Sequence, residues 1–330
     1  MASIPPVPPM GSRRQPLVEN PWSAWPLGGR TLSAKWGGAP STGVAPAVRL
    51  LAEVQRVVES MEMRAAVRKT YGPADLSSVP VFAGGFINFG YWHSIDLAGR
   101  LTVADRVRSQ EDMYRHVLDA AGPLAGRRTV EVGCGLGVGC ALALLEYRPE
   151  RVTGMDIHPQ QLDRARRTNA DLLKTSPSRI RFVRGAAEDM PFDEDEFDCV
   201  YSVEAAQHFD DMTAFARETA RVLRPGGRVV VASFFTPDDA PDSGARLASY
   251  LESFADGLDI ARPVAHVTEA LTGAGLTDAR ATSIGPDVWQ GWDRWLSDQW
   301  KPGTWPRNFL KTFEQGLLDY YVVTATRPTA

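Results

Sequence analysis

Short apolar segments alternate with amphipathic ones over the second half of the chain. The apolar segments have the length of strands and lie at 127–134, 151–157, 179–185, 197–203 and 228–234. Between them, the spacing of apolar residues predicts helices at 138–147, 159–173 and 213–223. This alternation predicts a mainly parallel sheet with helices on both faces.

The C-terminal part continues the pattern with one helix and a pair of strands. The helix is expected at 262–274, and the strands at 278–284 and 319–326. Such a late pair suits two further strands at one edge of the same sheet. We therefore expect a doubly wound, seven-stranded, Rossmann-like α/β domain over 126–330, with a C-terminal lid over the substrate at about 236–318.

The N-terminal part divides into a tail and a helical segment. Residues 1–45 are rich in Pro, Gly and Ser and are expected to be mostly irregular. A helix is expected at 46–70, because Leu51, Val54 and Val58 recur at spacings of three and four. We expect this helix to begin an N-terminal helical cap that extends to residue 125. It packs on the core, covers a substrate site or forms a homodimer contact.

Composition narrows the class of protein and its compartment. The formal net charge of −4 argues against a broad nucleic-acid-binding face. No apolar run is long enough to span a membrane, and the Pro-rich start lacks the apolar core of a signal peptide. The three cysteines do not form a disulfide framework. We therefore expect a cytoplasmic protein without stable membrane insertion.

Alternating glycines follow the first strand. Gly133, Gly135 and Gly137 form the pattern G-x-G-x-G, and Glu131 precedes the first of them by two residues. Glycine allows close approach of the backbone to a ligand, and α/β sheets bind ligands where their strands end. A dinucleotide fingerprint requires G-x-G-x-x-G, and a carboxylate repels a pyrophosphate. The ammonium group of S-adenosylmethionine suits an acidic neighbour, so this compound is the expected cofactor.

Carboxylates also follow the second and third strands. Asp156 can accept hydrogen bonds from the hydroxyl groups of a ribose, or it can cap the helix that begins near Pro159. Glu188 and Asp189 can contact the adenine edge, or they belong to a solvated acidic loop.

The order of four segments resembles class I S-adenosylmethionine-dependent methyltransferases. These segments are VEVGCGLGVG, GMDI, GAAEDMPF and LRPGGRVVV. Further stretches, GGFINFGYWH (84–93) and SVEAAQHF (202–209), are similar to the erythromycin O-methyltransferase type, and phthiotriol-type lipid methyltransferases share parts of the pattern. The resemblance implies methyl transfer to a hydroxyl of a lipophilic secondary metabolite or lipid. Ala186 departs from it, since many relatives carry an acidic residue there.

The expected cofactor site combines these segments. Its predicted residues are Tyr91, Glu131, Gly133, Gly135, Gly137, Asp156, Ile157, Ala187, Glu188, Asp189 and Val203.

Two residues after the fourth strand are candidates for catalysis. A hydroxyl acceptor benefits from a base, and histidine suits proton transfer near neutral pH. His208 lies where the methyl group is expected, as base or substrate contact, or it makes a structural hydrogen bond. Glu204 is the candidate base or counter-charge for methylation at carbon. The histidines lack the spacing of metal ligands, so no metal is expected.

Aromatic residues suggest where a lipophilic acceptor binds. Tyr91 and Trp92 are expected to close over the cofactor, because an aromatic face attracts a sulfonium, or they pack in the core. Trp289 and Trp292 share one face of an expected helix and form an acceptor wall, a core or a subunit interface. We expect the acceptor to contact Trp92, His93, Trp289 and Trp292.

Three functions remain open at this point. The leading hypothesis is O-methylation of a lipophilic acceptor in the biosynthesis of antibiotics or other natural products. The second is C-methylation of an isoprenoid or another electron-rich carbon, with or without coupled cyclisation. The third is a methyltransferase-like protein that catalyses a cyclisation or only binds the cofactor.

Overall fold

The computed structural model describes residues 63–73, 75–79 and 81–329. The predicted tail at 1–45 and most of the helix expected at 46–70 lie outside these residues, and so does the question of a dimer contact there. Within the described part, no helix combines the length and apolar character needed to cross a membrane.

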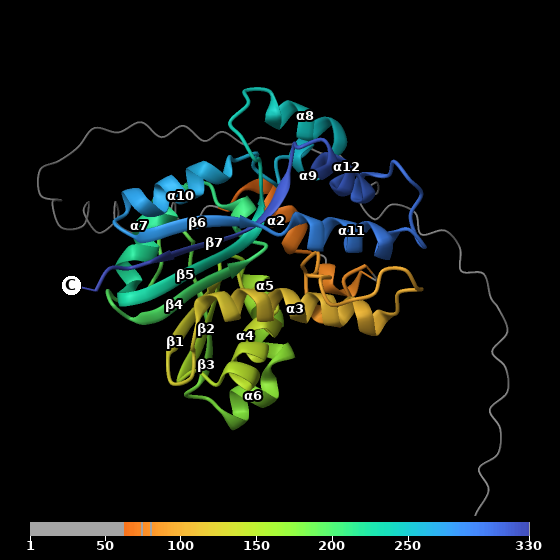
Figure 1. Cartoon of the computed structure of the whole chain (residues 1–330). Coiled ribbons are helices and arrows are strands. Elements are labelled where there is room, and N and C mark those ends of the chain that lie inside the picture. The colour runs from red at the N-terminus through yellow and green to blue at the C-terminus, as the bar shows by residue number, and fades with distance from the viewer. Residues whose placement is uncertain (1–62, 74, 80, 330) are drawn as a thin grey trace, which may run out of the picture. The chain divides into compact units, whose positions relative to one another are not determined.

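Seven strands form a single sheet in the order β3-β2-β1-β4-β5-β7-β6 (Figure 1). The strands are β1 (Arg128–Val132), β2 (Arg151–Asp156), β3 (Ile180–Arg184), β4 (Phe197–Val203), β5 (Leu223–Phe235), β6 (Thr277–Ser283) and β7 (Asp319–Thr326). The first five are parallel, and β7 runs antiparallel between β5 and β6. The predicted fold class, and the addition of the two late strands at one edge, are confirmed.

Helices precede and connect the strands. In the first half they are α2 (Ala65–Tyr71), α3 (Val103–Ala121), α4 (Val138–Leu142), which continues as a π-helical turn (Ala143–Tyr147), α5 (Pro159–Thr168) and α6 (Ala170–Thr175). In the second half they are α7 (Met212–Val222), α8 (Ser243–Tyr250), α9 (Glu252–Ala255), α10 (Val264–Gly273), α11 (Gly285–Leu296) and α12 (Asn308–Glu314). Short 3₁₀ turns lie at Leu76–Ser78, Ala83–Gly85, Ala206–His208 and Trp305–Arg307.

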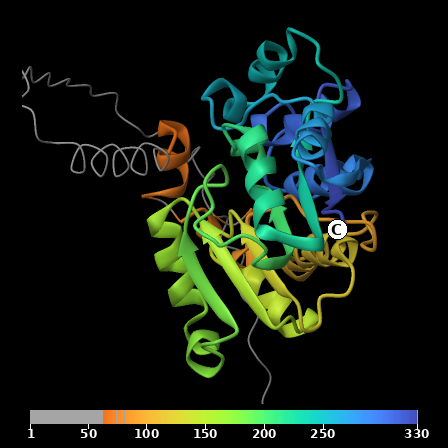
Figure 2. The same cartoon turned by 90° about the vertical axis from the view of Figure 1, so that its left-hand side faces the viewer.

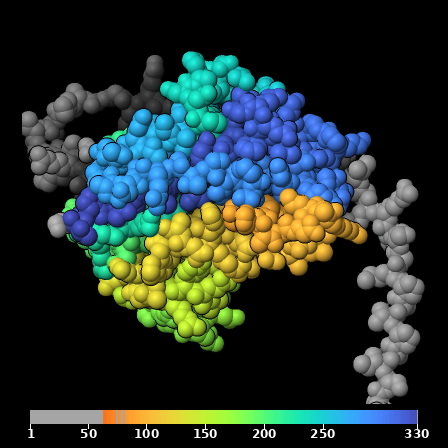
Figure 3. Space-filling model, viewed as in Figure 1, coloured from red at the N-terminus to blue at the C-terminus, as the bar shows by residue number. Residues whose placement is uncertain are grey.

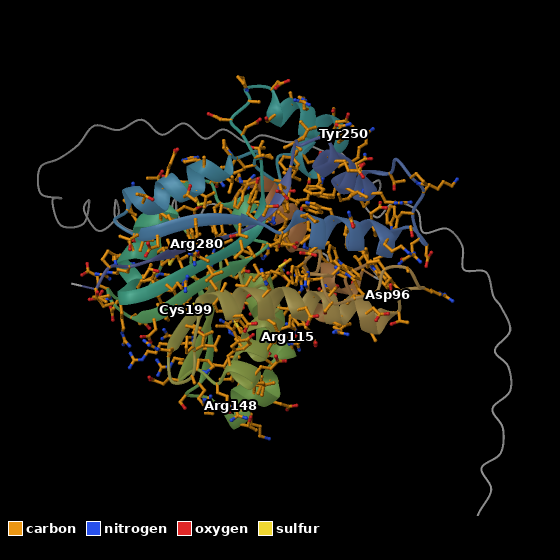
Figure 4. The ribbon with its side chains drawn as sticks, in the orientation of Figure 1. Asp96, Arg115, Arg148, Cys199, Tyr250 and Arg280 are labelled. Carbon is orange, nitrogen blue, oxygen red and sulfur yellow. The ribbon has the colours of Figure 1, made fainter. Side chains whose placement is uncertain are left out.

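Both faces of the sheet are buried, as the alternation along its central strands requires. In β5, Val230 and Phe234 join a core with residues of α3, α4 and α11, whereas Val229 and Val231 join a second core with α7 and α10. On the first face, Arg115 of α3, labelled in Figure 4, pairs with Glu146 of the π-helical turn at 2.8 Å.

Two predicted boundaries differ from the structure for local reasons. The helix expected at 159–173 is divided at Asn169, whose buried amide donates to Ala165 O and to Leu136 O in the glycine loop. The fifth strand begins at Leu223 rather than at 228, because Leu223 already pairs with Phe197 before a register shift.

The segment before α3 packs against the C-terminal part of the chain. Figure 3 shows this orange segment beside the blue surface to which α11 belongs. Trp92 N donates to Asp287 O (2.7 Å), and the side chain of Arg294 donates to Gly99 O (2.8 Å). These bonds hold the segment 81–101 along α11.

The order of the strands reverses at the centre of the sheet. From β1 the chain proceeds outward to β2 and β3, and it then returns to β4 on the other side of β1. The carboxyl ends of β1 and β4 therefore adjoin at a topological switch point, which is where open α/β sheets bind ligands.

Candidate functional site

A pocket opens at this switch point, over the carboxyl ends of β1, β2 and β4. The predicted site residues among those that line it are Gly133, Gly135, Asp156, Ile157, Ala187, Glu188, Val203, Glu204 and His208. The structure thus brings together most of the expected cofactor residues and both candidates for catalysis.

The glycine loop has a shape that other residues cannot adopt without strain. Gly133 has φ +77°, and a Cβ there would lie 2.3 Å from Cβ of Ala205. Gly137 has φ +67°, and a Cβ there would lie 2.4 Å from the ring of Phe182. Gly137 does not itself line the pocket; it starts α4. The glycines therefore let the loop after β1 pass tightly between β4 and β3.

Asp156 holds this loop to the end of β2. Its Oδ2 accepts from Gly135 N at 2.9 Å, and its Oδ1 accepts from His158 N at 2.8 Å. The cap of α5 is His158, whose Nδ1 accepts from Gln160 N, so the alternative role of Asp156 as the helix cap is wrong. Burial raises the pKa of Asp156 to about 6. Each carboxylate oxygen has a further lone pair, which can accept from a ligand hydroxyl.

Glu131 lies beneath the pocket rather than in its lining. It is fully buried and accepts hydrogen bonds from the Tyr114 hydroxyl (2.8 Å) and Cys140 Sγ (3.0 Å). Burial raises its pKa to about 7. Tyr114 does line the pocket, so Glu131 fixes the hydroxyl of a lining residue without reaching the pocket itself.

The acidic loop after β3 contributes one of its two candidate carboxylates. Glu188 lines the pocket, whereas Asp189 does not. Glu188 Oε1 accepts from Asp210 N at 2.8 Å, beside the start of α7, and burial raises the pKa of Glu188. Ala187 also lines this end of the pocket.

Glu204 follows β4 with a strained backbone and a fixed carboxyl group. Its φ of +49° is in the left-handed region, which is unusual for residues other than glycine. Its Oε1 accepts from Phe89 N at 2.6 Å and from the Tyr320 hydroxyl at 3.0 Å. Burial raises the pKa of Glu204 to about 8, so the carboxyl group is mostly protonated at neutral pH.

The backbone around Phe89, whose N–H donates to Glu204, is held by a buried arginine. The guanidinium of Arg106 in α3 donates to the carbonyl oxygens of Asn88, Phe89 and Val81. It is fully buried, and burial lowers its pKa to about 9. The N–H of Phe89 is therefore fixed in place for Glu204.

His208 lies on the 3₁₀ turn after Glu204. Its Nε2 is 2.8 Å from the hydroxyl of Tyr71, and its Nδ1 is 3.0 Å from Leu258 O and 3.1 Å from Asp259 Oδ1. The predictions from sequence missed Tyr71 and Asp259. Neither belongs to a motif, and they come from segments far apart in the chain.

The helix α2 also lines the pocket, through Val67 and Tyr71, and so do Met63 and Arg64, which directly precede it. In Figure 2 it is the short orange helix beside green segments of the chain. Arg64 pairs with Asp210 at 2.6 Å and donates to His208 O (2.7 Å) and Leu258 O (3.1 Å). At the other end, Arg164 of α5 donates to Tyr71 O at 2.8 Å. Two arginines thus hold α2 in place.

The expected aromatic residues lie outside the pocket. Trp92, Trp289 and Trp292 are buried in the core around Phe89, whose ring centroid is 5.0 Å from that of Trp289 and 4.8 Å from that of Trp292. The three-residue spacing of the tryptophans at 289 and 292 is compatible with an acceptor wall and with a buried helix face. In the structure, these two tryptophans form a buried face of α11.

Tyr91 and His93 are also away from the pocket. Tyr91 stacks on His116 of α3 with centroids 4.4 Å apart, and His93 is exposed and pairs with Asp287 at 3.1 Å. The aromatic contacts predicted for cofactor and acceptor therefore do not come from residues 91–93 in this structure.

The pocket suits S-adenosylmethionine in its hydrogen-bond acceptors and in its open backbone at Gly135. The carboxylate of Asp156 has capacity to accept from ribose hydroxyls. A Cβ at Gly135 would meet one atom within 4 Å, the amide nitrogen of Gln161 at 3.8 Å, so the backbone there is open to a ligand. Asp156 and Glu188 place carboxyl groups in the lining, which suits a cationic ligand.

Comparisons with known proteins agree with this geometry. A methyltransferase domain model matches residues 130–231. The chain is 30% identical to erythromycin 3''-O-methyltransferase of Saccharopolyspora erythraea over 64% of this chain and 69% of that protein. It is 31% identical to a fatty-acid O-methyltransferase of Mycolicibacterium smegmatis over 49% of this chain and 57% of that protein.

A solved structure shares the fold. Geranyl diphosphate C-methyltransferase from Streptomyces coelicolor superposes with a TM-score of 0.67 at 18% identity, over 79% of this chain and 96% of that one. The matched domain at 130–231 contains the glycine loop, Asp156 and His208, and the chain belongs to the S-adenosylmethionine-dependent methyltransferases.

Proposed function

We propose that this enzyme transfers a methyl group to a hydroxyl of a lipophilic small molecule in natural-product or lipid biosynthesis. The observation that carries the proposal is the presence of His208 in the same pocket as the glycine loop and Asp156. A group that can take a proton thus lies beside the residues expected to hold the cofactor.

The chain has three tasks in such a reaction. S-adenosylmethionine supplies an electrophilic methyl group when it is bound. Asp156 and Gly135 hold the nucleoside part, which orients the reactants and contributes much of the rate enhancement. The imidazole of His208 receives the proton that a hydroxyl loses. Val67 of α2 and Met63 just before it line the pocket with apolar side chains, which limits the access of water.

The charges around the pocket favour a neutral acceptor. Its described lining carries the carboxyl groups of Asp156, Glu188, Glu204 and Asp210, and one guanidinium, that of Arg64. Arg64 is already engaged by Asp210 and by backbone carbonyls. An anionic acceptor such as a carboxylate or diphosphate therefore gains little from these described residues, whereas an alcohol loses nothing.

The named relatives support the lipophilic class of acceptor. Their names refer to erythromycin, to fatty acids and to phthiotriol dimycocerosates. These acceptors differ widely in shape while sharing large apolar parts, so we propose the class and not one compound.

Methylation at carbon is the second candidate, and Glu204 favours it. The carboxyl group lies in the pocket with a pKa near 8, and it borders the aromatic core through Phe89. Its ionised form, which prevails above about pH 8, stabilises a carbocation and then removes a proton from it.

Product analysis with four probe acceptors tests the proposal. The enzyme is incubated with S-adenosylmethionine and 1-dodecanol, n-dodecyl glucoside, dodecanoic acid or farnesene, and the products are examined by mass spectrometry. We expect one added methyl on a hydroxyl probe. Methylation of farnesene alone would support the carbon reaction, and methylation of dodecanoic acid alone would contradict the charge argument.

A further inference from the structure

Both ring nitrogens of His208 already have protein partners. Nδ1 faces Leu258 O and Asp259 Oδ1, and Nε2 faces the Tyr71 hydroxyl at 2.8 Å and Gln207 Nε2 at 3.2 Å. An acceptor hydroxyl that bonded directly to His208 would have to displace one of them.

The partners determine where the proton of the neutral ring resides. The carbonyl oxygen of Leu258 can only accept, so Nδ1 carries the hydrogen. Nε2 is then the acceptor, and the Tyr71 hydroxyl donates to it. A continuous line of hydrogen bonds thus runs from Tyr71 through His208 to the loop at 258–259.

The Tyr71 hydroxyl has room for one more partner. It lines the pocket, and within the described part of the chain its hydrogen-bond partner is His208. Its remaining lone pair can accept from a hydroxyl group in the pocket. Arg164 fixes the backbone of the residue by donating to Tyr71 O and to Gly72 O, at 2.8 and 2.7 Å.

We propose that Tyr71, rather than His208, contacts the acceptor hydroxyl and relays its proton to His208, an inference that rests on the proposed O-methylation. The proton of the acceptor moves to Tyr71 Oη while the Tyr71 proton moves to His208 Nε2. The acceptor oxygen bonds to the methyl carbon as the methyl–sulfur bond breaks, and that electron pair stays on sulfur. The positive charge of the sulfonium ends on the imidazolium.

The phenol acts as a relay because it does not ionise by itself. Burial, together with the carboxylates of Asp259, Glu204 and Asp156, raises the pKa of Tyr71 far above its ordinary value. The hydroxyl therefore accepts a proton only while it passes its own proton on.

Asp259 is the charge partner of this relay. Its side chain is buried, with Oδ1 3.1 Å from His208 Nδ1. The hydrogen bond from Nδ1–H to Leu258 O holds the ring with Nε2 toward Tyr71, and the Asp259 carboxylate stabilises by its charge the imidazolium that the transfer produces. Arg64, which donates to the carbonyl oxygens of both His208 and Leu258, keeps the two segments together.

Tyr71→Phe separates the relay from a direct base. With 1-dodecanol as acceptor, the relay predicts that kcat falls about 100-fold while KM and the Kd for S-adenosylhomocysteine change less than about threefold. The double variant Tyr71→Phe/His208→Ala should lose no more than His208→Ala alone, because the two residues act as a unit. Tyr147→Phe is the matched control, since its hydroxyl binds Asp119 and Arg115 O instead.

Two kinetic outcomes would overturn the proposal. If His208 is the direct base, removal of the phenol hydroxyl frees Nε2, and kcat stays the same or rises. If Tyr71 only shapes the pocket, KM or the Kd for S-adenosylhomocysteine rises and kcat does not fall.

A spectroscopic measurement tests the hydrogen bond without turnover. In ¹⁵N-histidine-labelled enzyme with S-adenosylhomocysteine, the His208 signals are assigned by their loss in His208→Asn. We expect the Nδ1–H form and a shift of the Nε2 resonance in Tyr71→Phe but not in Tyr147→Phe. An unchanged Nε2 resonance would refute the relay. Failure of the proposed function would appear separately, as methylation of farnesene but of neither hydroxyl probe.

Discussion

Replacing Glu204 by glutamine should change how the stability of the ligand-free enzyme depends on pH. The carboxyl group has a pKa of about 8 when folded, against an ordinary value of 4.5. The folded state therefore binds the proton more tightly than the unfolded state, and between these two pH values stability falls as pH rises. Glutamine cannot ionise, and its Oε1 can still accept from Phe89 and Tyr320.

The expected loss of stability follows from the difference between the pKa values of Glu204 in the folded and unfolded states. Between pH 4.5 and 7, the unfolded chain loses the proton and the folded chain keeps it over about two and a half pH units. At about 1.4 kcal/mol per unit, the wild type loses about 3 kcal/mol that Glu204→Gln keeps. The raised pKa values of Glu131 and Asp156 also make stability fall as pH rises. Both proteins share these contributions, so the difference in their free energies of unfolding isolates Glu204.

Urea unfolding of both proteins at pH 5, 6, 7 and 8, without ligand, measures this difference. The free energy of unfolding of Glu204→Gln relative to wild type should rise steadily with pH. Glu314→Gln, at an exposed position on α12, is the control for the loss of one negative charge. A difference that stays constant within about 0.5 kcal/mol from pH 5 to 8 would refute the claim that burial holds a proton on Glu204.

Three further variants test the site. Asp156→Ala should abolish most binding of S-adenosylhomocysteine in calorimetry, and it should lower stability by about 1–3 kcal/mol because two backbone N–H groups lose their acceptor; binding within threefold of wild type would contradict the ribose role. Gly133→Ala should unfold at lower urea and bind the cofactor product weakly, because the new Cβ meets Ala205, whereas Gly99→Ala, with nothing within 4 Å, should match wild type in both measurements. His208→Ala should lower kcat about 10²–10⁴-fold with little change in the Kd for S-adenosylhomocysteine, and turnover near the wild-type rate would exclude proton acceptance by the imidazole.

The sequence predicted the parts of the site that lie at strand ends. Hydrophobic periodicity located β1, β2 and β4, and parallel strands end at one edge, so Gly133, Asp156 and His208 were expected near one another. Residues outside such elements gave no comparable signal. Tyr71 lies on a seven-residue helix and Asp259 in a loop, and only the packing of α2 and of the 257–259 segment over β4 brings them to His208.

The tryptophans of α11 show a second limit of prediction from sequence. A tryptophan at every third position identifies one face of α11, but the same spacing is compatible with a substrate wall and with a packed core. Residues remote in sequence decide that this face is buried in the core. Among them are Phe89 and Phe309, whose rings pack against Trp289. Periodicity identifies a buried face and does not identify what covers it.

The helix α2 contributes both to the wall of the pocket and to the hydrogen bonding of His208. The helix that covers the pocket also carries the hydroxyl bound to His208, and Arg64 and Arg164 hold it through backbone carbonyl oxygens. Because Tyr71 belongs to α2, its distance from the imidazole is set by where this helix lies. The shape of the pocket and the hydrogen bond that prepares His208 therefore depend on the same short helix.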